Sequence, residues 1–147
     1  MKLVIVGLSV LLSGAFVTQA LAEIQQGVLL RCGASKGTAY FFKDDLTNPG
    51  GPEWSDDGIS EGKISLVRLG DEWDIQFGDA LGAYGYREDG ASVVPLGTSD
   101  KMITIGAFRG TYADVYTFNL ADGEVLWSSH KIGSAVPKVG MYRAKCK

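Results

Sequence analysis

The chain has 147 residues with 14 Lys and Arg against 17 Asp and Glu, a formal net charge of −3. This acidic balance argues against a nucleic-acid partner, because phosphate binding relies on clustered basic side chains. One histidine and two cysteines exclude the metal sites that need several histidines, so we expect neither a metal nor another cofactor.

The first residues have the pattern of a cleavable signal peptide over residues 1–22. Lys2 supplies the positive start, residues 3–17 are an almost unbroken apolar run, and Ala20-Leu21-Ala22 is a small-x-small cleavage pattern. A membrane anchor is the alternative, but the run is shorter than the roughly 20 residues that span a bilayer as a helix. We therefore expect an exported protein, periplasmic or extracellular, free of the membrane after cleavage, with residues 23–147 as one domain.

The two cysteines, Cys32 and Cys146, lie near the two ends of this mature chain. An exported chain meets an oxidising compartment, in which such thiols pair. A metal site competes with this interpretation, but two thiols and one histidine are a poor ligand set. We predict a disulfide that encloses nearly the whole mature chain, which the chain-entropy model values at roughly 4 to 5 kcal/mol.

The mature chain is predicted to be all-β. Large apolar residues alternate with polar ones, as in residues 73–77, and no window combines helical apolar spacing with a cap. The chain holds 20 glycines, about twice the usual share. Ten short segments are rich in β-branched and aromatic residues, which predicts an antiparallel up-and-down barrel or a β-sandwich of about 8 to 10 strands. They are residues 27–32, 38–42, 63–69, 73–77, 83–87, 91–96, 102–108, 113–120, 125–130 and 141–146.

Turn signals separate these segments. Asp89-Gly90 and Asp122-Gly123 each stand between two strand-like runs, where such a pair favours a hairpin because both residues tolerate positive φ. We therefore predict one hairpin over residues 83–96 and another over residues 113–130. Further turns are expected at residues 33–37 and 70–72.

Residues 44–62 are predicted to form a long loop, and loops of this length are often functional. The candidate binding residues in it are Trp54, Asp56 and Asp57. Trp54 is expected either to plug an open end of the barrel or to anchor a partner within an acidic rim. The plug is favoured because the large apolar area of tryptophan is usually buried. The acids lack the spacing of a calcium-binding loop, so no metal is assigned to them.

Charge is unevenly distributed along the chain. Residues 44–79 are rich in acids, whereas residues 125–147 contain basic residues and no acid. The favoured interpretation is that the two stretches are solvated and attract each other in the fold. The alternative is that the acidic stretch steers a cationic protein partner.

No catalytic residue is assigned from the sequence. Ser128-Ser129-His130 suggests a hydrolase, but in a strand Ser128 and His130 share one face while Ser129 points to the other, and no nucleophile elbow precedes them. His130 is therefore interpreted as a surface residue. A small hydrolase that uses carboxylates remains an alternative, because sequence spacing does not show which acids lie close together.

The expected architecture resembles that of the small periplasmic lysozyme inhibitors, which are also compact β proteins. Their signature Ser-Gly-x-x-Tyr has its nearest counterpart in Ser35-Lys36-Gly37-Thr38-Ala39-Tyr40, which has one residue too many. The resemblance implies inhibition of a cationic enzyme by analogy and assigns no residue a role. The main expectation is an exported binding or interaction module, with a cationic protein or a small ligand as its partner.

We predict cleavage after Ala22. Mass spectrometry of the protein recovered from the cell envelope or the medium should find Glu23 at its N-terminus. Exported material that still begins at Met1 would contradict the prediction.

Overall fold

The computed structural model describes residues 26–79 and 82–147, so the predicted signal peptide lies outside the described residues. The regular elements in the described part are all strands, which confirms the all-β prediction. No described segment forms a helix long and apolar enough to cross a membrane. The ten strands are β1 (Gly27–Phe41), β2 (Glu53–Asp57), β3 (Lys63–Leu69), β4 (Glu72–Asp79), β5 (Gly82–Gly85), β6 (Ser92–Thr98), β7 (Met102–Arg109), β8 (Tyr112–Asn119), β9 (Glu124–Lys131) and β10 (Lys138–Cys146).

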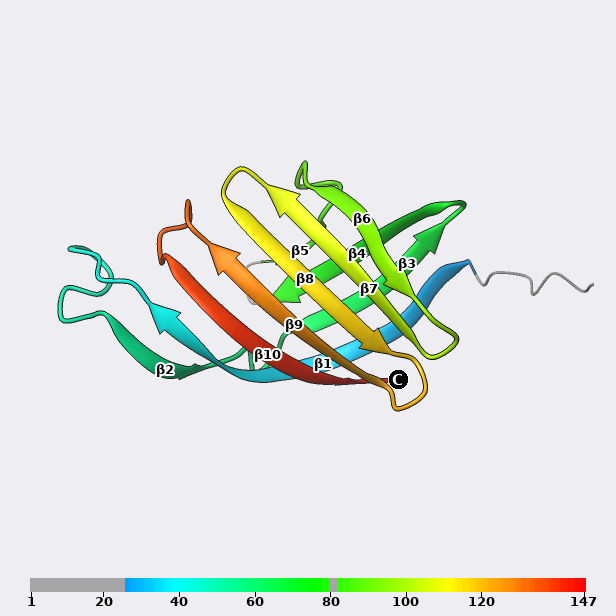
Figure 1. The fold of residues 1–147 in the computed structure, drawn as a ribbon, viewed down its shortest axis with the longest axis horizontal. Coiled ribbons are helices and arrows are strands. Elements are labelled where there is room, and N and C mark those ends of the chain that lie inside the picture. The colour runs from blue at the N-terminus through cyan, green and yellow to red at the C-terminus, as the bar shows by residue number, and fades with distance from the viewer. Residues whose placement is uncertain (1–25, 80–81) are drawn as a thin grey trace, which may run out of the picture.

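The strands form one antiparallel sheet in the order β5-β4-β3-β1-β10-β9-β8-β7-β6, and β2 pairs with β1 beside this path. The sheet curves into a half-barrel (Figure 1). Of the two expected architectures, the structure therefore matches the barrel-like one. The concave face of the sheet holds the core, whose largest fully buried side chains are Tyr116, Phe118, Ile64, Leu66, Ile75, Ile105 and Val125.

β1 is one continuous strand, so the turn predicted at residues 33–37 is wrong. Neither Gly33 nor Gly37 has a positive φ, and the pairing with β10 continues past them with a shift of register between Cys32 and Ser35. Both glycines therefore lie within an irregular strand and not in a turn. On its other side, β1 pairs first with β3 and then with β2, which lets β2 extend beyond the rest of the half-barrel (Figure 1).

The predicted disulfide is confirmed. Cys32 and Cys146 are bonded to each other and lie directly opposite in the pairing of β1 with β10. Beside them, Arg31 and Lys147 exchange two backbone hydrogen bonds of 2.8 Å. The bond therefore joins the first and last strands at the middle of the sheet.

One of the two predicted hairpins is confirmed and the other is wrong. β8 and β9 pair as expected, with Gly123 at φ +59° in the turn. At the other Asp-Gly pair the turn also forms, with Gly90 at φ +85°, but β5 pairs with β4 and β6 pairs with β7. The strands on either side of this turn are therefore the two opposite edges of the sheet. The turn still forms because an Asp-Gly pair fixes local φ and does not require its flanking strands to pair with each other.

The turn after β5 holds the two sheet edges together. The Arg87 side chain donates from Nε to the carbonyl oxygen of Trp73 on β4 at 2.8 Å, and from Nη2 to that of Val93 on β6 at 3.0 Å. The backbone N–H of Tyr86 also donates to the Ile75 carbonyl at 3.1 Å. One guanidinium group thus bridges the open side of the half-barrel.

Replacing Arg87 with methionine should lower the free energy of unfolding by about 1 to 3 kcal/mol, the range for hydrogen bonds made by a charged group. Denaturant titration measures the change. Arg31→Met is the matched control, because Arg31 is exposed on β1, and a surface change of this kind should stay within about 0.5 kcal/mol. Equal midpoints for the two variants would contradict the bridging role.

Candidate functional site

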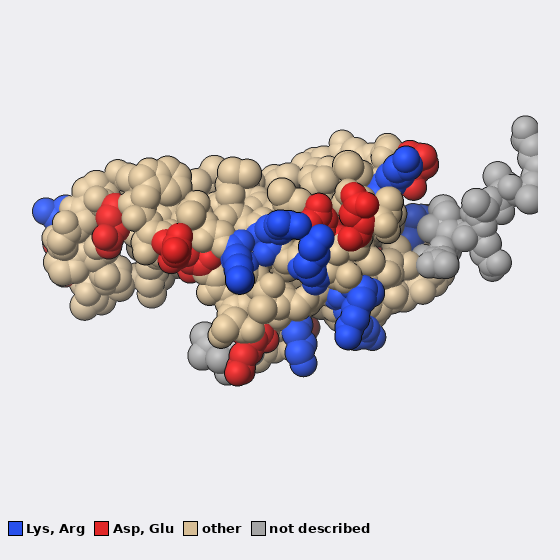
Figure 2. All heavy atoms as spheres, turned by 90° about the horizontal axis from the view of Figure 1, so that it is seen from below, with Lys and Arg blue, Asp and Glu red and all other residues tan. Residues whose placement is uncertain are grey.

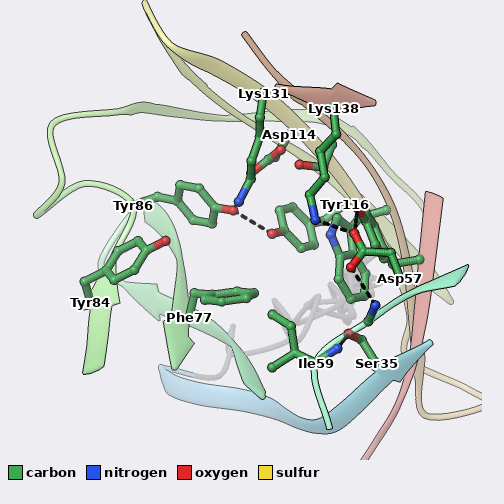
Figure 3. A pocket seen from close by; sticks show the side chains of 14 residues that line it. Ser35, Asp57, Ile59, Phe77, Tyr84, Tyr86, Asp114, Tyr116, Lys131 and Lys138 are labelled. Carbon is green, nitrogen blue, oxygen red and sulfur yellow. Dashed lines mark hydrogen bonds and ion pairs between the residues drawn. The ribbon is translucent and has the colours of Figure 1, made fainter. Parts of the chain in front are cut away.

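A cavity of about 60 Å³ lies on the concave side of the half-barrel (Figure 3). Residues of β1, β2, β8, β9 and β10 line one side, and Phe77 of β4 and Tyr84 of β5 face them from the other. A single water needs about 10 to 15 Å³. The cavity therefore has room for several waters or for one small molecule.

Most of the cavity wall on this side belongs to three neighbouring rows of residues across β8, β9 and β10, of which Tyr112 and Gly140 alone do not line the cavity. Residues two apart in a strand share a face, and cross-strand partners at one level form a row. From the core outward, the rows are Tyr116–Trp127–Tyr142, Asp114–Ser129–Gly140 and Tyr112–Lys131–Lys138. The surroundings thus change from aromatic to polar to cationic toward the end of these strands.

The aromatic row forms the floor. Tyr116 and Trp127 stack with ring centroids 5.4 Å apart, and Trp127 and Tyr142 stack at 5.1 Å. Such pairs contribute about 0.5 to 1.5 kcal/mol each beyond the area they bury. The floor is therefore a rigid support for the polar groups above it.

One polar group is the cluster of Asp57, Tyr142 and Lys138. Tyr142 donates its hydroxyl to Asp57 Oδ2 at 2.7 Å, and the Lys138 ammonium pairs with the same oxygen. Gly37 of β1 lies between them, opposite both Asp57 and Tyr142 in register. A Cβ at Gly37 would be 2.7 Å from Tyr142 Cδ1, so only glycine leaves room for this contact across β1.

The cluster keeps Asp57 ionised. Partial burial acts to raise the pKa of Asp57, but the hydrogen bonds from Lys138 and Tyr142 outweigh it and hold the pKa below its usual range. Burial and the hydrogen bond to Asp57 raise the pKa of Tyr142. Asp57 and Lys138 therefore neutralise each other at the edge of the cavity.

The second polar group is a chain of hydroxyls that ends on Asp114. Tyr86 donates its hydroxyl to Asp114 Oδ2 at 2.6 Å, and the Tyr86 and Tyr116 hydroxyl oxygens are 2.6 Å apart. A hydroxyl has one proton to donate, so Tyr116 donates to Tyr86. Burial raises the pKa of both tyrosines well above the usual value, so both stay neutral.

Two polar atoms in this region have no hydrogen-bond partner within residues 26–79 and 82–147. Asp114 Oδ1 and Ser129 Oγ are buried without a hydrogen bond, and each residue is 3% exposed. A buried polar atom left unsatisfied costs about 1 to 3 kcal/mol. Both residues line the cavity, which has room for a hydrogen-bonding molecule such as water.

The three candidate residues of the predicted loop separate in the structure. Residues 44–62 include β2 and are not one long loop. Asp57 lines the cavity, whereas Trp54 lies on the opposite face of β2 beside Tyr40, with ring centroids 5.4 Å apart. Trp54 is 68% exposed, so the predicted plug is wrong: β2 pairs with β1 beside the main strand order, and this side chain lies on the face opposite to the cavity. Asp56 is also exposed.

Sequence reasoning missed Asp114 and Ser129. A signal was present, because Asp114 is in phase with Tyr112 and Tyr116 on β8, and a polar residue on an apolar face is informative. Ser129 is in phase with Trp127 in the same way. The prediction that Ser129 points away from His130 is confirmed, since Ser129 is buried and His130 exposed.

Among residues 26–79 and 82–147, no group of three or more His, Cys, Asp or Glu is placed to hold a metal ion. Asp44, one of the acids considered for calcium, accepts hydrogen bonds from the backbone of Leu46 and Thr47 instead. Asp57, another, pairs with Lys138. Asp44 Oδ1 and Asp57 Oδ2 are therefore each engaged by other groups of the protein.

The expected attraction between the acidic and basic stretches has one example in the pair of Asp57 and Lys138. On the outer surface, Glu124 pairs with Arg143 at 2.8 Å and with Lys145 at 3.2 Å. Figure 2 shows basic side chains gathered near the middle of the underside, with acids beside them. Such exposed pairs contribute little to stability, about 0 to 1 kcal/mol each.

Comparisons with known proteins found no matching family model, no matching curated protein and no matching solved structure.

The lowered pKa of Asp57 predicts a stability contribution that is fully present above the ordinary carboxyl pKa of about 4 and is lost as the pH falls through the folded-state value. At pH 7, Asp57→Asn should lower the free energy of unfolding by about 1 to 3 kcal/mol, because Lys138 loses a charged partner. Between pH 7 and 3, the variant should lose less stability than the wild type.

Denaturant midpoints across this pH range measure both effects. Asp56→Asn is the matched control, because Asp56 is the exposed neighbour on the same strand. The same pH dependence in the wild type and in Asp57→Asn would show that the cluster does not act in this way.

Proposed function

We propose that the chain is an exported binding protein that takes a small polar ligand into the cavity of the half-barrel. One observation carries the proposal: Asp114 Oδ1 and Ser129 Oγ are buried in residues that line the cavity, without a hydrogen-bond partner in the described part of the chain. Native proteins satisfy nearly all buried polar atoms. A ligand that offers a hydrogen-bond donor to Asp114 Oδ1 and a polar group to Ser129 Oγ satisfies both atoms.

The construction of the cavity supports ligand binding. Binding sites for small molecules combine apolar walls with a few fixed polar groups and are largely preformed. Here Trp127 and Phe77 supply apolar surface, while the hydroxyl chain from Tyr116 through Tyr86 holds Asp114 in place. A volume of about 60 Å³ restricts the occupant to a small molecule or to one group of a larger one.

A disulfide is compatible with an oxidising, exported location. Together with the signal pattern in residues 1–22, it supports a role outside the cytoplasm. A binding protein there would meet its ligand in the periplasm or in the medium.

A hydrolase that uses carboxylates is the second candidate, because Asp57 and Asp114 both line the cavity. A general acid works best with a pKa raised toward the operating pH. The pKa of Asp57 is shifted downward, and Lys138 occupies its carboxylate. Binding is therefore the better-supported function.

The test is a thermal-shift screen of residues 23–147 against amino acids, amines, organic acids, sugars and polyols. A true ligand should raise the melting temperature, since binding at 100 times Kd stabilises by about 2.7 kcal/mol. Ser129→Ala should weaken its binding by about tenfold, the effect of one lost hydrogen bond. Turnover of the ligand would instead favour the hydrolase.

Ser128→Ala is the matched control. Ser128 is adjacent on β9 but faces the other side of the sheet, so its replacement should leave the affinity unchanged. The proposal fails if no compound in these classes binds, or if the two serine variants bind equally well.

A further inference from the structure

We infer that the ligand of this cavity is a small zwitterion, whose cationic nitrogen binds Asp114 and Ser129 and whose anionic group binds Lys131. The inference rests on the proposed function and specifies the ligand class. It follows from the charges in the cavity wall, of which one anion and one cation form no ion pair with any residue that the structure describes.

Asp114 requires a donor, and its charge favours a cationic one. Its Oδ2 accepts the Tyr86 hydroxyl at 2.6 Å, while its Oδ1 has no partner. None of the ion pairs in the described residues involves Asp114. A buried carboxylate is costly unless a cation or several donors compensate it, and an ammonium group supplies both.

Lys131 is the matching cation. It follows Ser129 on the same face of β9 and lines the cavity, and Figure 3 shows its side chain reaching toward Tyr86 and Asp114. Its cross-strand neighbour Lys138 is neutralised by Asp57. Lys131 itself forms no ion pair within residues 26–79 and 82–147.

One molecule with both charges compensates both groups. A simple amine leaves Lys131 without an anion, and a simple carboxylate leaves Asp114 without a cation. A neutral polyol supplies hydrogen bonds but no charge, and hydrogen bonds to charged groups are the stronger ones. The cavity volume of about 60 Å³ limits the zwitterion to the size of a small amino acid.

The test is isothermal titration calorimetry of residues 23–147 with glycine, β-alanine and 4-aminobutyrate, which separate their charges by increasing distances. Ethylamine, propionate and glycerol are the probes with one charge or none. We expect at least one zwitterion to bind about tenfold more tightly than each of these three. About tenfold in affinity is the contribution of one additional charge-assisted contact.

The variants assign each end of the ligand. Lys131→Met should reduce the affinity for the zwitterion to that of ethylamine, and Asp114→Asn should reduce it to that of propionate. Lys131 lies at the rim, so its variant remains informative if Asp114→Asn does not fold. Lys101→Met is the control, because Lys101 is exposed in the turn before β7 and should leave binding unchanged.

The outcomes separate this inference from the proposed function. Glycerol binding that depends on Ser129, with no preference for a zwitterion, overturns the inference and leaves the proposed function in place. A zwitterion whose affinity survives Lys131→Met also overturns it. If none of the six probes binds and the wider screen is negative, both fail, and Lys131 then compensates Asp114 within the protein.

Discussion

The polar end of the half-barrel depends on the close approach of side chains across Gly37. Because this position has no Cβ, Tyr142 lies against β1 and its hydroxyl reaches Asp57 on β2. Tyr142 stacks on Trp127, and Trp127 stacks on Tyr116. Through the hydroxyl chain, Tyr116 connects to the turn after β5. A single continuous set of contacts therefore runs from the extended edge strand to the turn that closes the sheet, and the cavity lies along it.

The two carboxylates of the cavity illustrate two different solutions to the burial of charge. Asp57 has a cation, a hydroxyl and a backbone N–H as partners, so it fastens β2 to β10. Asp114 has one tyrosine hydroxyl and one unpartnered oxygen, although it is far more buried. A protein stabilised by its own contacts alone has no need of such an atom, because its desolvation lowers stability. The imbalance distinguishes a carboxylate that is held by the fold from one on which the proposed ligand site depends.

Local patterns are sufficient to predict most of the strands, the disulfide and the β8–β9 hairpin, because alternation, cysteine count and turn chemistry are properties of short segments; they miss β2 and the continuity of β1. They were insufficient wherever the outcome depended on distant strands. The Asp89-Gly90 signal predicted a turn correctly but not that its flanking strands are opposite sheet edges. The large apolar area of Trp54 predicts that it lies in the interior. Its strand, β2, instead pairs with β1 beside the main strand order, and the side chain is exposed. Asp114 and Gly37 acquire their roles from residues on other strands, and no sequence window contains those partners.

The strand order divides the chain into two consecutive blocks, β1 to β5 and β6 to β10, each assembled from pairings between near neighbours in sequence. The blocks join through β1 and β10, whose cysteines are separated by 114 positions. Such long-range pairing is slow, because loop-closure entropy is spent before the contacts form. The first block supplies Asp57 and Phe77 to the cavity, and the second supplies Asp114, Ser129 and Lys131. Neither half contains all the lining residues, so the cavity is assembled only when the two blocks dock, and its formation reports that the whole chain has reached its native arrangement.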